Sequence, residues 1–230
     1  MSVTVNQILA DAAIIFEDVG NVFWEKPEGL TWVNAGQKEI VRLKPDANIV
    51  TSSIKMAAGT RQTLPTGDIC LVKINRNMGT DGNTPGKVVV LVNLKELDQQ
   101  DPDWHTADSA AAVDYYAYDE RDPLVFWVSP PSDGNGYIEG ARSTTPDDVA
   151  SVDDNINIAD VYSSVLMDYV LFRGFSKNSE SPVHRQRAMD HHTLFMQALG
   201  LQDQSEMVYT PNLPASARVG NMMTTPVSGG

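Results

Sequence analysis

The acids of the central third are the residues whose type and spacing come nearest to a catalytic pattern. Four of them lie close together, at Asp114, Asp119, Glu120 and Asp122. Two carboxyl groups facing each other across a cleft hydrolyse glycosidic bonds, and the tyrosines among these acids would suit a sugar ring. Acids are frequent throughout the chain, however, so chance clustering and strand packing explain them more simply. No GxSxG nucleophile motif is present.

The histidines offer a second possible chemistry. His184, His191 and His192 fall in an expected helix, but the seven-residue spacing of the first two is not the three or four that metal ligands on one helix adopt. His105 follows Trp104 in the acidic segment 101–105, where an imidazole and carboxylates could act as acid and base. A turn anchored by the tryptophan is the simpler interpretation. We therefore expect no catalytic residues, no metal site and no cofactor.

Charge and cysteine content exclude further classes. Lys and Arg total 17 against 30 Asp and Glu, giving a formal charge of -13, the opposite of the basic surface that grips phosphates. Such a surface still allows DNA to pass without being held. Cys70, the single cysteine, excludes an internal disulfide and a Cys-rich zinc motif. No apolar run has the length of a membrane span and residues 1–6 lack a secretory signal, so we expect a cytoplasmic protein without membrane contact.

Helical periodicity dominates both ends of the chain. Residues 4–19 carry an apolar face behind a capping box of Thr4 and Gln7, and a second helix ends before Pro45. After residue 155, apolar residues from Ile156 to Phe172 predict a third helix, and a fourth runs from Pro182 to a stop at Gly200. Residues 1–49 thus supply a first helix pair, and residues 151–201 a closing helical hairpin of the same antiparallel bundle.

Between the helix pairs the periodicity is that of strands. The β-rich runs are 69–74, 88–94, 115–118 and 125–128, separated by clusters of Gly, Pro, Asn and Asp. Residues 50–150 therefore predict an inserted antiparallel β domain, in which Trp104 and Trp127 are the expected anchors. Residues 202–230 have no apolar period and predict an extended C-terminal arm. The predicted class is α+β.

The order of several short strings resembles one known family. These strings are 32–37 (WVNAGQ), 57–65 (AAGTRQTLP), 75–79 (NRNMG), 123–131 (PLVFWVSPP) and 169–177 (YVLFRGFSK). Together with Leu97-Asp98 and Pro102-Asp103-Trp104 they span most of residues 5–200. In this order and spacing the chain resembles the head-to-tail adaptor, or head-completion, proteins of short-tailed bacteriophages.

That resemblance implies a structural virion protein rather than an enzyme. It implies a homo-oligomeric, dodecameric ring below the portal protein, joined to the tail tube or nozzle protein at the head–tail junction, through whose lumen DNA leaves without specific binding. It also implies that the arm reaches the portal. The residues of the arm that we expect to contact the portal are Met207, Tyr209, Leu213, Met222 and Met223.

Two alternatives of other classes remain. One is the polysaccharide-acting hydrolase, with the acids of residues 114–122 in a cleft. The other is a small monomeric module that binds carbohydrate or peptide.

Overall fold

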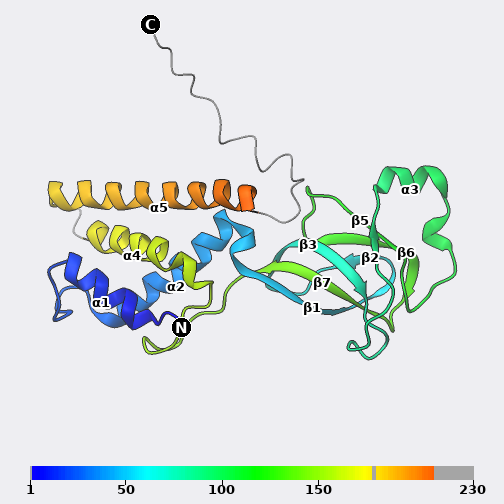
Figure 1. The fold of residues 1–230 in the computed structure, drawn as a ribbon, viewed down its shortest axis with the longest axis horizontal. Coiled ribbons are helices and arrows are strands. Elements are labelled where there is room, and N and C mark those ends of the chain that lie inside the picture. Colours follow the sequence, from blue (N-terminus) through cyan, green and yellow to red (C-terminus); the bar gives the residue numbers. More distant parts are fainter. Residues whose placement is uncertain (1, 178–179, 210–230) are drawn as a thin grey trace, which may run out of the picture. The chain divides into compact units, whose positions relative to one another are not determined.

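The protein consists of two compact units (Figure 1). The computed structural model describes residues 2–177 and 180–209, with side chains as far as Gly200. A helical unit takes residues up to 36, 149–156 and those from 160 onward, and a β unit takes residues 37–148 and 157–159. The predicted α+β class is confirmed, because helices and two sheets are both present.

A local signal in the sequence defines the start of the first helix. The helices are α1 (Val5–Ile15), α2 (Lys26–Leu43), α3 (Leu94–Gln100), α4 (Ser163–Lys177) and α5 (Pro182–Tyr209). The capping box of α1 forms as predicted: the amide of Gln7 donates to Thr4 Oγ1 over 3.3 Å, and the Thr4 amide donates to Gln7 Oε1 over 2.9 Å. Such a box satisfies two backbone donors that a helix end otherwise leaves open.

Helix α4 lies at the centre of the helical unit. It packs between α1 and α5 (Figure 1), and it lies so close to α2 that a Cβ on Gly36 would come within 2.5 Å of Leu166 Cδ1. Contacts such as Phe175 with His184 and Tyr169 with Phe195 show that α4 and α5 run antiparallel. The buried residues of this core include Ile8, Leu9, Val33, Val165, Leu166, Leu171, Phe175 and Phe195.

Three predicted helix boundaries are wrong. The first helix was predicted over residues 4–19, but α1 ends at Ile15 and the chain turns at Glu17, whose φ is 59°. The third predicted helix was expected to take in Ile156, but α4 begins only at Ser163, after a 3-10 turn of Asp160–Tyr162. Ile156 and Ile158 are buried in extended chain, so their apolar character reflects burial rather than helical period. Helix α5 also passes through Gly200 and ends at Tyr209, because a glycine inside a helix costs only about 1 kcal/mol. The first part of the predicted extended arm is therefore helical.

The β unit is built from two sheets. The first has the order β1-β7-β3, with β1 (Ile49–Lys55), β7 (Tyr137–Thr144) and β3 (Asp68–Asn77); the second has the order β2-β6-β5-β4, with β2 (Ala58–Thr63), β6 (Val125–Asp133), β5 (Tyr115–Tyr118) and β4 (Val90–Leu91). All pairs are antiparallel except β4 with β5, which is parallel. That pair departs from the prediction of a purely antiparallel domain.

One hydrophobic cluster joins the two sheets. It includes Ile54, Leu71, Ile74 and Ile138 from the first sheet and Tyr116, Phe126 and Val128 from the second. The run 88–94, predicted as one strand, contributes only the short β4. Asn93 ends that strand because its side chain accepts from the Lys95 amide over 2.9 Å and caps α3.

Candidate functional site

Two of the acids of residues 114–122, Asp114 and Asp119, have separate structural partners. Lys87 Nζ donates to Asp114 Oδ1 over 2.8 Å at the start of β5. Asp119 accepts from the Arg121 amide over 3.0 Å, within a turn that the Asp122 amide also stabilises. The Tyr116 ring beside them belongs to the hydrophobic core. This part of the chain therefore forms a strand and its turn, which is the simpler of the two sequence interpretations.

Both tryptophans proposed as anchors lie in the β unit. Trp104 is 1% exposed, and its Nε1 donates to Asp98 Oδ1 over 2.9 Å. Its ring stacks on His105 at 3.8 Å between centroids, and His105 Nδ1 is 2.8 Å from Thr60 Oγ1. Trp127 is half-buried in β6, where it pairs with residues of β2 and β5. His105 is thus positioned by packing and by a hydroxyl.

The histidines of α5 pack against the aromatic face of α4. His191 Nδ1 lies 2.9 Å from Asp168 Oδ1, and the His191 ring stacks on Phe175. The His184 ring lies 5.6 Å from Phe175, and the His192 ring 4.9 Å from Phe172. Within residues 2–177 and 180–209 no group of three His, Cys, Asp or Glu side chains could hold a metal ion. The three imidazoles therefore serve the contact between α4 and α5.

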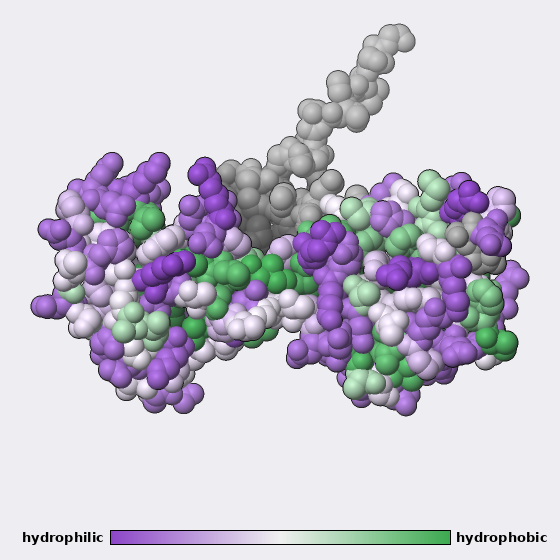
Figure 2. Space-filling view, turned by 180° about the vertical axis from the view of Figure 1, so that it is seen from behind, coloured by the Kyte–Doolittle hydropathy of each residue, from purple (hydrophilic) through white to green (hydrophobic). Residues whose placement is uncertain are grey.

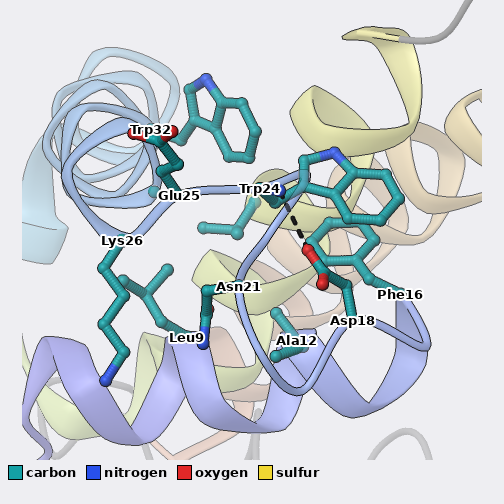
Figure 3. A pocket seen from close by; sticks show the side chains of 12 residues that line it. Leu9, Ala12, Phe16, Asp18, Asn21, Trp24, Glu25, Lys26 and Trp32 are labelled. Atoms are coloured by element: carbon teal, nitrogen blue, oxygen red, sulfur yellow. Dashed lines mark hydrogen bonds between the residues drawn. The ribbon is translucent and has the colours of Figure 1, made fainter.

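The connection between α1 and α2 is tightly built (Figure 3). The Asp18 carboxylate accepts from the amides of Val22, Phe23 and Trp24 over 2.9 to 3.0 Å. These bonds, the one from Trp24 first, lower the pKa of Asp18 below its ordinary value. The Phe16 and Trp24 rings stack at 4.3 Å, as the close view shows (Figure 3). The cavity that they help to line has a volume of about 10 Å³, room for no more than one water molecule.

Five large hydrophobic side chains of the same segment face solvent. We call them the knob: Ile14, Ile15, Val19, Val22 and Phe23. Val22 is 83% exposed and Val19 73%. Single exposed apolar residues need no explanation, but five of them within residues 14–23 make this segment a candidate interaction surface.

A second apolar surface lies between α4 and α5. This groove has a volume of about 330 Å³ and is lined by Phe172, Ser176, Arg185, Ala188, Met189 and His192. Met189 is 61% exposed, and Met196, about two helical turns further along, is also exposed. Methionine side chains adapt to the shape of a partner, so the groove is suited to accept a protein surface.

The β unit has its own exposed apolar residues. Val88, Val90 and Leu91 are each at least half exposed on and beside β4. Val88 and Leu91 line a shallow hollow of about 470 Å³ between β3 and β4, together with Lys73 and Arg76. Figure 2 shows one face of the molecule, on which apolar patches lie among hydrophilic residues. Each unit thus carries surfaces that a partner could cover.

The expected portal-contacting residues have different positions. Met207 and Tyr209 belong to the last turns of α5, whereas Leu213, Met222 and Met223 lie outside the described residues. None of the described helices combines the length and the hydropathy needed to cross a bilayer.

Sequence reasoning missed the knob and the groove. A signal for the knob existed: Val19, Val22 and Phe23 stand in a connection where polar residues are usual, directly after two adjacent isoleucines at a helix end. The groove gave no such signal, because its lining comes from two helices whose facing side chains only the structure brings together.

Comparison with protein-family models identifies the family of the chain. No curated protein matches the chain. The family model of the SU10 adaptor protein, however, matches residues 3–215, which is most of the 230 residues. The chain belongs to the SU10 adaptor protein family, and it is a structural adaptor protein of the bacteriophage virion.

Proposed function

We propose that this chain is a subunit of a dodecameric ring that joins the portal protein to the tail tube or nozzle and forms part of the DNA exit channel. Membership of the adaptor family supports this role. The structural observation that carries it is the presence of two different apolar surfaces, the knob and the groove, on one helical unit. A closed ring needs such non-identical patches, since each subunit presents one surface to one neighbour and another to the next.

The arm is assigned to the portal side, and the helical unit to one set of neighbours. In this proposal α1, α2, α4 and α5 close one antiparallel bundle, and the chain beyond it reaches the portal through Met207, Tyr209, Leu213, Met222 and Met223. Trp104 and Trp127 anchor the β unit, which faces other neighbours. A chain truncated after Gln202 should then bind portal rings much more weakly than the full chain. If the truncated chain binds portal rings as strongly as the full chain, the arm does not contact the portal.

The charge of the chain suits a channel for DNA. A subunit of net charge -13, repeated around a ring, repels the phosphate backbone. Its 17 Lys and Arg are outnumbered by 30 Asp and Glu, so release of counterions from DNA contributes little to binding. DNA would pass without specific binding. The protein would occupy the head–tail junction of the virion after assembly in the host cytoplasm.

A structural role implies that the chain has no catalytic residues and needs no cofactor. The hydrolase alternative would be favoured by turnover of a cell-surface glycan that is lost when an acid of residues 114–122 is replaced. The binding-module alternative would be favoured by a protein that stays monomeric in the presence of portal.

The test is the mass and shape of the full chain, alone and mixed with the portal protein of the same phage. Light scattering and electron microscopy should find rings, either free or on the portal. A monomer that ignores the portal would contradict the proposal.

A further inference from the structure

The knob is held in a defined shape before any partner binds. Three backbone amides bond to the Asp18 carboxylate, and Trp24 Nε1 donates to the Gly174 carbonyl oxygen over 2.9 Å. Glu17 and Asn21 have positive φ angles of 59° and 52°, a left-handed conformation that is uncommon for a residue such as glutamate and more frequent for asparagine. A rigid apolar surface loses little conformational entropy on docking. The knob therefore has the properties of a preformed contact.

The α4–α5 groove has the size to receive such a contact. Its volume of about 330 Å³ corresponds to the lower end of the range for pockets, roughly 300 Å³, which admits a few side chains rather than a whole helix. Phe172 and Ala188 form its floor, and Met189 borders it with a flexible side chain.

Charge distinguishes this groove from others on the same unit. Residues 11–25, which carry the knob, contain four acids and no Lys or Arg, whereas residues 172–193, which form the groove, contain four Lys or Arg against two acids. Arg185 lines the groove itself. The hollow on the other side of α4, between α1 and α4, is lined by Asp11 and would repel the acids beside the knob. In a chain of net charge -13, the α4–α5 groove is the complementary surface.

We propose that the knob of one copy docks in the α4–α5 groove of the next copy, and that this contact closes the ring. The inference rests on the proposed function, which it deepens by naming the two surfaces between neighbouring subunits. Because knob and groove are different surfaces, the contact is heterologous and repeats around a ring. Val22 and Val19 enter the groove against Phe172 and Met189, while the acids of the knob segment face Arg185.

Two substitutions on exposed side chains test the contact. Val22→Asp places a charge in the knob, and Met189→Asp places one at the groove. Val161→Asp is the matched control, because Val161 is 63% exposed on the same unit but belongs to neither surface. Full chains are compared by sedimentation equilibrium, alone and on portal rings, after circular dichroism has shown equal helix content and equal Tm. We expect at least tenfold weaker self-association for Val22→Asp and for Met189→Asp. The Val161→Asp control should self-associate as strongly as the unaltered chain.

Mixing the two variants tests the heterologous geometry. The Val22→Asp chain keeps an intact groove and the Met189→Asp chain an intact knob, so an equimolar mixture should form dimers that do not grow into rings. Rings formed by either variant alone, or a mixture without dimers, would overturn the inference. If a Val22→Asp or Met189→Asp chain still forms intact rings but no longer binds the tail protein, the inference is also overturned, because the substituted surface then contacts the tail protein rather than a neighbouring subunit. If the unaltered chain forms no rings even on the portal, the proposed function itself fails.

Discussion

Replacement of Gly136 by alanine should unfold the β unit at a markedly lower temperature. A Cβ on this residue would lie 1.8 Å from the Ala111 carbonyl oxygen and 2.8 Å from Met56 Cε, against an ordinary contact distance of 3.4 to 4 Å. The methionine side chain can move away. The carbonyl oxygen cannot do so easily, because the neighbouring Ala110 amide is held by the Pro131 carbonyl oxygen over 2.9 Å.

The magnitude follows from two contributions. Overpacking costs about 1–3 kcal/mol, and we expect the upper value since backbone must move. The displaced Gly136 carbonyl also loses its 3.0 Å bond from the Met56 amide, which contributes about 1 kcal/mol. The free energy of unfolding should therefore fall by about 3–4 kcal/mol. For a unit of this size that corresponds to a decrease in Tm of roughly 12–16 °C.

Differential scanning calorimetry measures the change in Tm, and urea unfolding the change in free energy. Gly86→Ala is the control: its Cβ would meet Asn77 at an ordinary 3.4 Å, so its Tm should stay within about 2 °C of the unaltered chain. A Gly136→Ala chain that also unfolds within about 3 °C of the unaltered chain would refute the close approach between Gly136 and Ala111.

Three further outcomes test other parts of the structure. Hydrogen bonds from backbone amides, that of Trp24 first, lower the pKa of Asp18 in the folded state. The ionised carboxylate therefore stabilises the fold at pH values above its ordinary pKa of 3.8. This stabilisation is lost as the pH falls through the lower pKa of the folded state. Urea unfolding of Asp18→Asn and of the unaltered chain should therefore differ above about pH 5 and converge towards about pH 2. Bonds from the amide of Asn83 and from Thr84 lower the pKa of Asp81 to about 2, so a carboxyl carbon NMR titration should have its midpoint there, not at the ordinary value. Trp104→Ala should cost about 3–5 kcal/mol in urea unfolding, and a cost below about 1 kcal/mol would contradict its burial.

Short-range signals in the sequence predicted the helices well. The box of Thr4 and Gln7, Pro45 after α2, and Ser181 before Pro182 each act within one helical turn, so their effect does not depend on the rest of the fold. The predicted C-terminal end of α5 was wrong, because Gly200 weakens a helix without ending it.

Strands held by their partners could not be predicted in the same way. In β2 only Gln62 is buried, and its side chain bonds to Ala57 and Gly59 of the same bend rather than entering an apolar core. Pairing with β6 holds β2 in place, and that partner lies about 70 residues away in the chain. The residues next to β2 in the sequence carry no information about a partner strand so far along the chain.

The candidate functional residues show the same difference between local signals and contacts that are distant in the sequence. Trp104 in its turn was predicted from neighbouring residues, and its burial fits the anchor that we propose. The groove was missed because Phe172 and Met189 come from separate helices. The knob was missed because the exposure of Val22 depends on the bonds from backbone amides to Asp18.

The assembly of the helical unit from both ends of the chain affects its synthesis on the ribosome. Helix α1 and the first half of α2 emerge before the β unit, whereas α4, against which they pack, follows it. At about 5–20 residues per second, the roughly 110 intervening residues delay that packing by on the order of 10 s. During this time Ile8, Leu9 and Val33 have no core to enter. The nascent chain should therefore depend on host chaperones, and a fragment that ends within the β unit should aggregate through its first two helices.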